Sequence, residues 1–218
     1  MLFPYKDDNP RILVPYVTYC IIGINALIFV LQFNLGISDP SAEKTFIYRF
    51  GFIPADFSLI TIFTSMFLHG GISHIIGNMW FLWIFGDNVE SVLGHIKYAI
   101  FYILCGVIAA ITQIVVNPDS QIPMVGASGA IGGILGAYLV NYPKARVLVL
   151  IPFGFFSQLI KIRALYVLGF WFILQFISSG GGVAYAAHIG GFVSGMILIL
   201  FFNKKNRIKK KIYKGPWA

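Results

Sequence analysis

Six long apolar stretches divide this chain, and they constrain its fold more than any other feature of the sequence. They lie at residues 15–35, 74–93, 97–116, 128–142, 164–178 and 184–202. A helix of about 20 apolar residues crosses the hydrocarbon core of a bilayer, and 58% of the residues are apolar while only 11% are charged. We therefore expect an all-α membrane protein. Its six transmembrane helices would occupy residues 15–202, between an N-terminal segment, 1–14, and a tail, 203–218.

Positively charged residues are distributed unevenly along the chain. If the N-terminus lies in the cytoplasm, only two of the sixteen Lys and Arg residues, Lys44 and Arg49, lie on the opposite side of the membrane. Cytoplasmic loops of membrane proteins are enriched in Lys and Arg, so we expect both termini to be cytoplasmic. The tail 203–218 is basic, and we interpret it as an anchor that contacts membrane lipids rather than as a nucleic-acid site.

Three connecting segments differ in character. Residues 36–73 contain many aromatic side chains, and we expect this external loop to lie in the membrane interface. Residues 143–163 hold an apolar patch that is broken by Pro152 and Gly154. We interpret this patch as an interfacial re-entry on the cytoplasmic side rather than as a seventh span. Residues 178–183 are rich in glycine, which indicates a flexible connection.

Four polar residues lie near the starts of three apolar stretches, at His74, Asn78, Ser128 and His188. These three stretches run in the same direction across the membrane, so their first residues lie near the same face. An ionisable residue inside a membrane span is a candidate functional residue, and serine with histidine is a typical pair of nucleophile and base. Taken alone, Ser128 also fits a serine that allows close helix packing, and His188 fits a structural histidine.

The same four residues include possible donors to a developing oxyanion. His74 and Asn78 are four residues apart and share a helix face, and the backbone N–H of Ser128 is free at a helix start. Helix capping or hydrogen bonding between helices also explains the pair His74 and Asn78. The stretches that carry Ser128 and His188 contain no carboxylate, which favours a dyad over a triad. We interpret Glu90, at the inner end of its stretch, as a structural hydrogen-bonding residue.

We expect neither a metal nor a cofactor. His69 lies five residues before His74 and has no HExxH pattern, so a zinc protease site is not indicated. Cys20 and Cys105 lie in separate apolar stretches without metal-ligand spacing, and we expect no disulfide between them. Residues 1–11 hold Pro4, Asp7 and Asp8 and lack the apolar region of a signal peptide, so we do not expect them to be one.

Four short motifs together resemble the rhomboid family of intramembrane serine proteases. They are HGGISHIIGN at 69–78, FGDNVE at 85–90, GASG at 126–129 and AHIGG at 187–191. The resemblance implies a six-transmembrane-helix rhomboid bundle that cleaves transmembrane protein substrates near the external membrane face. Ser128 would be the nucleophile and His188 the general base. His74, Asn78 and the Ser128 backbone N–H would form the oxyanion hole.

The chain departs from the family pattern at two places. Many members carry Trp-Arg in the first external loop, where this chain has Ile60 and Thr61. Many also place an aromatic residue one turn after the serine, where this chain has Gly132, which leaves the orientation of the His188 ring open. The chain resembles the minimal six-span form that is most usual in bacteria and archaea, so we expect a location in the prokaryotic plasma membrane.

A substrate gate is predicted beside the site. The stretch 164–178 is short and carries the bulky residues Trp171 and Phe172, and the glycine-rich connection follows it. A transmembrane substrate has to enter sideways from the lipid, so this wall is the part expected to move.

Two other functions remain open. The first is a non-proteolytic rhomboid-like protein that binds membrane helices, although inactive relatives typically lose the serine or the histidine and this chain keeps both. The second is a small transporter, which the absence of an obvious internal repeat disfavours. The sequence leaves the substrate and the oligomeric state undetermined.

Overall fold

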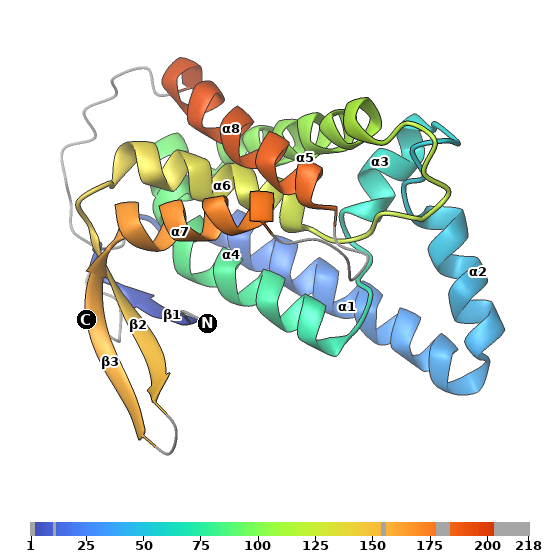
Figure 1. Ribbon diagram of the computed structural model, residues 1–218, viewed down its shortest axis with the longest axis horizontal. Coiled ribbons are helices and arrows are strands. Elements are labelled where there is room, and N and C mark those ends of the chain that lie inside the picture. The colour runs from blue at the N-terminus through green and yellow to red at the C-terminus, as the bar shows by residue number, and fades with distance from the viewer. Residues whose placement is uncertain (1–2, 11, 154–155, 178–183, 203–218) are drawn as a thin grey trace.

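The computed structural model describes residues 3–10, 12–153, 156–177 and 184–202. Within them the chain forms eight helices and three strands, arranged as a helical bundle with a small sheet at one end (Figure 1). The helices are α1 (Tyr16–Ser38), α2 (Pro40–Phe50), α3 (Leu59–Ser65), α4 (Ile72–Leu93), α5 (His95–Val116), α6 (Ser128–Asn141), α7 (Ala164–Ile177) and α8 (Tyr185–Phe202). The strands are β1 (Phe3–Asp7), β2 (Arg146–Phe153) and β3 (Phe156–Arg163). The predicted basic tail 203–218 and glycine-rich connection 178–183 lie outside the described residues.

Each of the six apolar stretches forms a helix whose ends agree with the predicted ends to within a few residues. Among the described residues, α1, α5 and α8 are long and apolar enough to cross a membrane, while α6 and α7 are shorter apolar helices of 14 residues each. The protein is therefore mostly helical with several candidate spans. The count of six spans and the domain limits 15–202 stay predictions.

Helix α6 lies at the centre of the bundle, where it packs against α4, α5, α7 and α8 (Figure 1). Its side chains Ile134, Leu135 and Tyr138 are fully buried. The contact with α8 is the closest, because glycines bring the two backbones together: a Cβ atom on Gly195 would overlap the backbone of Gly133. Close backbone approach through small residues is how membrane helices associate without a hydrophobic driving force.

The segment 143–163 contains two strands, so the prediction of an all-α protein is wrong here, while its position at the membrane interface stays a prediction. Strands β2 and β3 form an antiparallel hairpin, with Val147 paired with Ile162 and Val149 with Ile160. The two valines are fully buried, and β-branched side chains favour extended backbone. Strand β1 pairs with β2 and completes a three-stranded sheet of order β1-β2-β3.

The N-terminal strand is tied to the helices as well as to the sheet. The Asp7 carboxylate accepts hydrogen bonds from the Tyr138 hydroxyl at 2.7 Å and from the Asn88 amide at 3.0 Å. The Trp80 indole N–H donates to the Pro4 carbonyl at 2.6 Å. These contacts with α4 and α6 hold the sheet at one end of the bundle.

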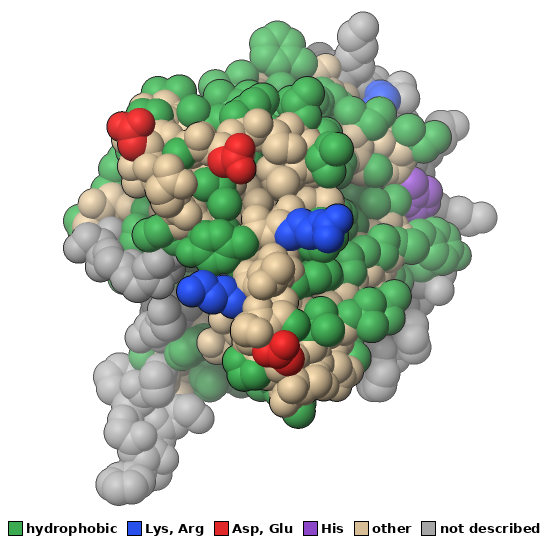
Figure 2. Space-filling view, turned by 90° about the vertical axis from the view of Figure 1, so that its right-hand side faces the viewer, with side chains coloured by type: hydrophobic (Ala, Val, Ile, Leu, Met, Phe, Trp, Pro, Cys, Tyr) green, Lys and Arg blue, Asp and Glu red, His purple; other side chains and the backbone are tan. Residues whose placement is uncertain are grey.

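Helices α2 and α3 lie at the opposite end of the bundle from the sheet (Figure 1). They occupy much of the predicted external loop 36–73, so this segment is largely helical. Figure 2 shows that hydrophobic side chains cover much of this end, with isolated charged side chains between them. Phe57, Leu59 and Ile60 are among the exposed apolar residues, as expected for a segment at a membrane interface.

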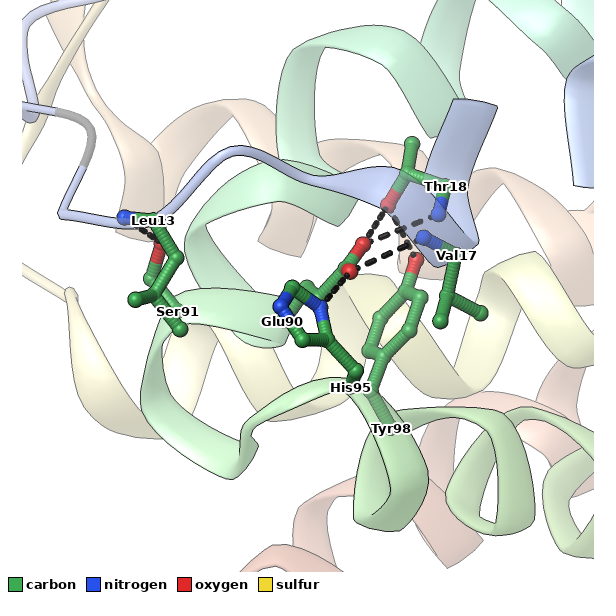
Figure 3. Close-up of polar contacts among 7 residues, drawn as sticks. All are labelled: Leu13, Val17, Thr18, Glu90, Ser91, His95 and Tyr98. Carbon is green, nitrogen blue, oxygen red and sulfur yellow. Dashed lines mark hydrogen bonds and ion pairs between the residues drawn. The ribbon is translucent and has the colours of Figure 1, made fainter. Parts of the chain in front are cut away.

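Glu90 on α4 has the structural role expected from the sequence. Its buried carboxylate accepts hydrogen bonds from the backbone N–H groups of Val17 and Thr18 at 2.9 and 2.8 Å, in the first turn of α1. It also accepts from the Thr18 hydroxyl at 2.7 Å and lies 2.6 Å from Nδ1 of His95 (Figure 3). Because the first N–H groups of a helix have no partner within the helix, Glu90 caps α1 from a neighbouring helix.

Candidate active site

Ser128 is the first residue of α6, and the loop before it is fixed by backbone contacts. The Gly126 N–H donates to the Ser65 carbonyl at 2.9 Å, and Met124 forms a bridge with Phe52. Gly126 has φ +125°, a conformation that favours glycine because it has no Cβ atom. These contacts set where the chain turns into α6 and therefore where the Ser128 side chain lies.

His188 lies in the first turn of α8, opposite Ser128. Its Nε2 atom is 2.7 Å from the Ser128 hydroxyl oxygen. The close approach of α6 and α8 makes this contact possible, because Gly191, one turn after His188, packs on the backbone of Gly129. A serine hydroxyl at this distance from an imidazole nitrogen can transfer its proton to the ring.

The pair opens into a cavity of about 440 Å³ between α3, α4, α5, α6 and α8. Ser128, His188 and His74 line it together with apolar side chains that include Met66 and Met124. Ser128 and His188 are half-buried. The cavity therefore gives a ligand access to the hydroxyl oxygen while it keeps the surroundings mostly apolar.

His74 and Asn78 lie on one face of α4, beside the loop that precedes Ser128. A Cβ atom on Gly126 would lie 2.8 Å from Nε2 of His74 and 3.5 Å from Nδ2 of Asn78, so both nitrogens face this loop. The Gly70 N–H donates to Nδ1 of His74 at 3.3 Å, so in the neutral ring the proton is on Nε2. Among the described residues, the buried Asn78 Nδ2 has no hydrogen-bond partner. The structure thus places two donors beside the loop that precedes Ser128, and of these two His74 also lines the cavity.

His69 packs against the edge of His74, with ring centres 5.2 Å apart. Gln32 on α1 holds its backbone, donating to the His69 carbonyl at 2.6 Å and accepting from its N–H at 3.2 Å. Burial, with a smaller effect of His74, lowers the pKa of His69 to about 4, so the ring is neutral at pH 7. His69 therefore supports the position of His74 without adding a charge.

Gln175 on α7 contacts the other face of the site, and the sequence analysis missed it. Its Oε1 atom is 2.8 Å from Nδ1 of His188. The one sign of it in the sequence is that Gln175 is a polar residue within the apolar stretch 164–178. The His188 ring also packs against Trp171 and Tyr185, with ring centres 5.9 and 6.3 Å away. Aromatic residues of α7 and α8 thus pack on His188. Many rhomboids instead carry an aromatic residue for this at the position of Gly132.

The predicted gate residues lie on the side of α7 that meets α8. Trp171 packs on both His188 and Phe192, and Phe172 stacks on Phe192 with ring centres 4.6 Å apart. Helix α7 therefore covers one side of the histidine. Whether it moves to admit a substrate stays a prediction.

Among the described residues, no group of three or more His, Cys, Asp or Glu side chains is placed to hold a metal ion. Cys105 is buried and Cys20 exposed, and both are free thiols. The chemistry that the described residues offer at this site is that of a serine, a histidine and neutral hydrogen-bond donors.

Comparison with known proteins identifies the family. The Rhomboid domain family model matches residues 56–205, which include all four candidate residues. The chain belongs to the rhomboid family. As a rhomboid with long apolar helices, it is an integral membrane protein.

Curated relatives of this rhomboid occur in bacteria and in mitochondria. Rhomboid protease GluP of Bacillus subtilis is 31% identical over 182 residues, which cover 83% of this chain and 34% of that protein. Rhomboid protein 1, mitochondrial, of Saccharomyces cerevisiae is 26% identical over 227 residues, 99% of this chain and 61% of that protein. The mouse presenilin-associated rhomboid-like protein, mitochondrial, is 29% identical over 194 residues, 86% of this chain and 49% of that protein. The chain thus spans between about a third and three fifths of these relatives.

Proposed function

We propose that this rhomboid is an intramembrane serine endopeptidase that cleaves transmembrane protein substrates with a Ser128–His188 dyad. The observation that carries the proposal is the 2.7 Å contact between Nε2 of His188 and the Ser128 hydroxyl oxygen, at the wall of a cavity. The family and the printed name of the relative from Bacillus subtilis, a rhomboid protease, support it.

The proposed reaction uses the side chains in sequence. The Ser128 hydroxyl oxygen attacks the peptide carbonyl carbon while Nε2 of His188 takes the hydroxyl proton. The negative carbonyl oxygen is held by the Ser128 backbone N–H, the Asn78 amide and Nε2–H of His74. The tetrahedral intermediate then releases the amine, which takes the proton from His188. Water, deprotonated by the same nitrogen, hydrolyses the acyl-enzyme and regenerates Ser128.

We place the cleavage near the external face of the membrane. The site lies toward the end of the bundle that carries α2 and α3, away from the sheet (Figure 1). The sheet end carries Arg146, Lys161 and Arg163, and an excess of such residues is typical of cytoplasmic segments. Both termini are accordingly proposed to be cytoplasmic, in a prokaryotic plasma membrane.

The proposal is tested by covalent labelling and by cleavage. Purified protein in liposomes is incubated with a fluorophosphonate probe and with a model transmembrane substrate whose products are mapped by mass spectrometry. The wild type should be labelled on Ser128 and should cut the substrate, whereas Ser128→Ala and His188→Ala should do neither. Ser194→Ala is the matched control, since this buried serine of α8 donates to the Gly191 carbonyl of its own helix and is not among the residues that line the cavity.

The outcomes separate the rival functions. A wild type that binds the substrate helix but is neither labelled nor active would be a non-proteolytic binder. Solute flux through the liposomes that survives Ser128→Ala would indicate a transporter. Cleavage by Ser128→Ala at the wild-type rate would overturn the assignment of the nucleophile.

A further inference from the structure

We propose that Gln175 is a positioning residue that holds His188 in the tautomer and orientation needed for a general base. The inference rests on the proposed function, because it assigns a role to the nitrogen of His188 that does not face Ser128. The contact that suggests it is the 2.8 Å distance between Oε1 of Gln175 and Nδ1 of His188.

The orientation of the Gln175 amide follows from its second contact. Its Nε2 atom donates to the Trp171 backbone carbonyl at 2.8 Å, one turn earlier in α7. A carbonyl oxygen can only accept, so the NH₂ group has to face Trp171 and the amide oxygen has to face His188. The choice between oxygen and nitrogen, which distances alone leave open, is therefore fixed by the hydrogen bonds.

The amide oxygen in turn fixes the histidine tautomer. An oxygen can only accept, so Nδ1 of His188 has to carry the proton and donate it to Gln175. In the neutral ring Nε2 is then left with a lone pair, and this atom lies 2.7 Å from the Ser128 hydroxyl oxygen. The opposite tautomer would present an N–H to the serine and could not take its proton. Gln175 thus selects the form of His188 that acts as a base.

This arrangement supplies, without a charge, the orienting group that a carboxylate provides in a serine protease triad. The Gln175 side chain is also held in one conformation, because it is 8% exposed and both its amide nitrogen and its amide oxygen form hydrogen bonds. Trp171 and Tyr185 pack on the ring of His188 but do not select its tautomer, which the hydrogen bond to Gln175 does.

The location of Gln175 connects the base to the wall of the site. Ser128 lies on α6, His188 on α8 and Gln175 on α7, so three helices have to be in place for the chain of contacts Ser128–His188–Gln175 to form. If α7 moves aside to admit a substrate, the Nδ1 contact is broken. Helix α7 then has to return before His188 is again competent as a base.

The test compares three substitutions at Gln175. Gln175→Leu keeps the size and removes the acceptor, and Gln175→Asn keeps the amide but is shorter by one methylene and does not reach His188. Gln175→Glu restores an acceptor oxygen at the original distance, and when the buried carboxyl is protonated its second oxygen donates to the Trp171 carbonyl as the amide does. Gln113→Leu is the matched control, because Gln113 lies on α5 and is not among the cavity-lining residues.

Three measurements are made on each variant: kcat and KM for the transmembrane substrate, the rate of fluorophosphonate labelling, and the ¹⁵N spectrum of labelled histidine. The His188 signals are assigned from the spectrum of His188→Gln. Gln175→Leu and Gln175→Asn should lower kcat by about 10–100-fold, the range found when a metal-binding histidine loses the partner that orients it, and leave KM within about twofold. Their spectra should show loss of the pure Nδ1–H tautomer, whereas Gln175→Glu and Gln113→Leu should stay close to wild type.

Wild-type kcat or an unchanged tautomer in Gln175→Leu would overturn the proposal. An equal loss of activity in Gln175→Glu and Gln175→Leu would also overturn it, because the side chain would then matter only for packing. If the wild type is neither labelled nor active, the proposed function fails instead. The ¹⁵N spectra still decide, in that case, whether Gln175 sets the tautomer of His188.

Discussion

Asn78 carries a buried amide donor for which the described residues provide no partner. A buried polar group without a hydrogen bond costs about 1–3 kcal/mol, so its presence in a folded protein calls for a reason. The amide faces Gly126, two residues before Ser128. A carbonyl oxygen that becomes negative during attack by Ser128 would give this donor the partner that it lacks in the free protein.

We therefore predict that Asn78→Ala lowers kcat with little change in KM. Loss of one oxyanion donor typically costs about 10²–10³ in kcat, and the effect falls on kcat because the interaction strengthens only in the transition state. Steady-state kinetics on a transmembrane substrate measure both constants. Asn34→Ala, on the exposed side of α1, is the control. A higher KM at constant kcat would make Asn78 a substrate-binding residue instead.

At the residue scale, the sequence predicted which side chains meet but not all of their partners. His74, Ser128 and His188 share one cavity because three helices that run in the same direction start at the same face. Gln175 was missed because its role depends on the rotation of α7 about its own axis. A 14-residue helix that is apolar nearly all round gives no periodic signal for that rotation.

At the scale of elements, the junction between α1 and α4 depends on one carboxylate. We predict that Glu90→Gln lowers the free energy of unfolding by about 3 kcal/mol. The carboxylate accepts from the backbone N–H groups of Val17 and Thr18 with its two oxygens. An amide has only one acceptor oxygen, and its NH₂ group would face one of these N–H groups without forming a hydrogen bond. Thermal unfolding in detergent measures the loss. The control is Glu43→Gln on α2, whose carboxylate accepts a single hydrogen bond within the described part of the chain, from Gln32 at 3.2 Å. Equal melting temperatures for the two variants would contradict the capping role.

The contact between α6 and α8 is equally sensitive to size. We predict that Gly195→Ala destabilises the protein by about 1–3 kcal/mol, the usual cost of overpacking, because the added methyl meets the backbone of Gly133, which has no side chain to move. Cleavage should fall too, since α8 carries His188. Gly23→Ala, where a Cβ meets nothing within 4 Å, serves as the control in thermal unfolding. The prediction fails if Gly195→Ala and Gly23→Ala have the same melting temperature.

If helix α7 is a substrate gate, weakening its packing on α8 without disturbing His188 should speed the entry of substrate. Phe172→Ala removes the stack on Phe192 and leaves Trp171 and Gln175 in place. We predict severalfold faster cleavage of a membrane-embedded substrate and an unchanged rate for a short soluble peptide. Phe170→Ala, at an exposed position of the same helix, should change neither rate. A parallel change for both substrates would argue against a gate.

The helices of this bundle could be predicted, whereas the sheet could not. Each apolar stretch is long enough to define a helix by itself, and the ends agree to within a few residues. The two strands within residues 146–163 were not predicted, because the same run of apolar residues fits an irregular segment as well as a strand. The alternating burial of Val147 and Val149 indicates a strand only when the N-terminal strand Phe3–Asp7 is known to pair with this segment. Such long-range pairing leaves no local signal in the sequence.

At the scale of the whole molecule, the attachment of this sheet makes stability depend on pH. Burial raises the pKa of the Asp7 carboxyl to about 7, an effect that the hydrogen bond from Tyr138 opposes and the charge of Asp87 reinforces. In the unfolded chain the pKa is about 4. The protonated carboxyl is therefore favoured in the folded state, and its contribution is complete below about pH 4 and is lost as the pH rises through about 7.

We predict that the free energy of unfolding falls by a few kcal/mol from this group between pH 4 and pH 7. Asp7→Asn, which mimics the neutral carboxyl, should be less dependent on pH than the wild type and more stable than it at pH 8. Chemical unfolding at a series of pH values in a constant detergent measures the difference between the two curves. Asp8→Asn is the control, because Asp8 lies next in the chain but is exposed, 3.3 Å from Lys161. If Asp7→Asn and the wild type show parallel curves, the Asp7 carboxylate is not the group that links the sheet to pH.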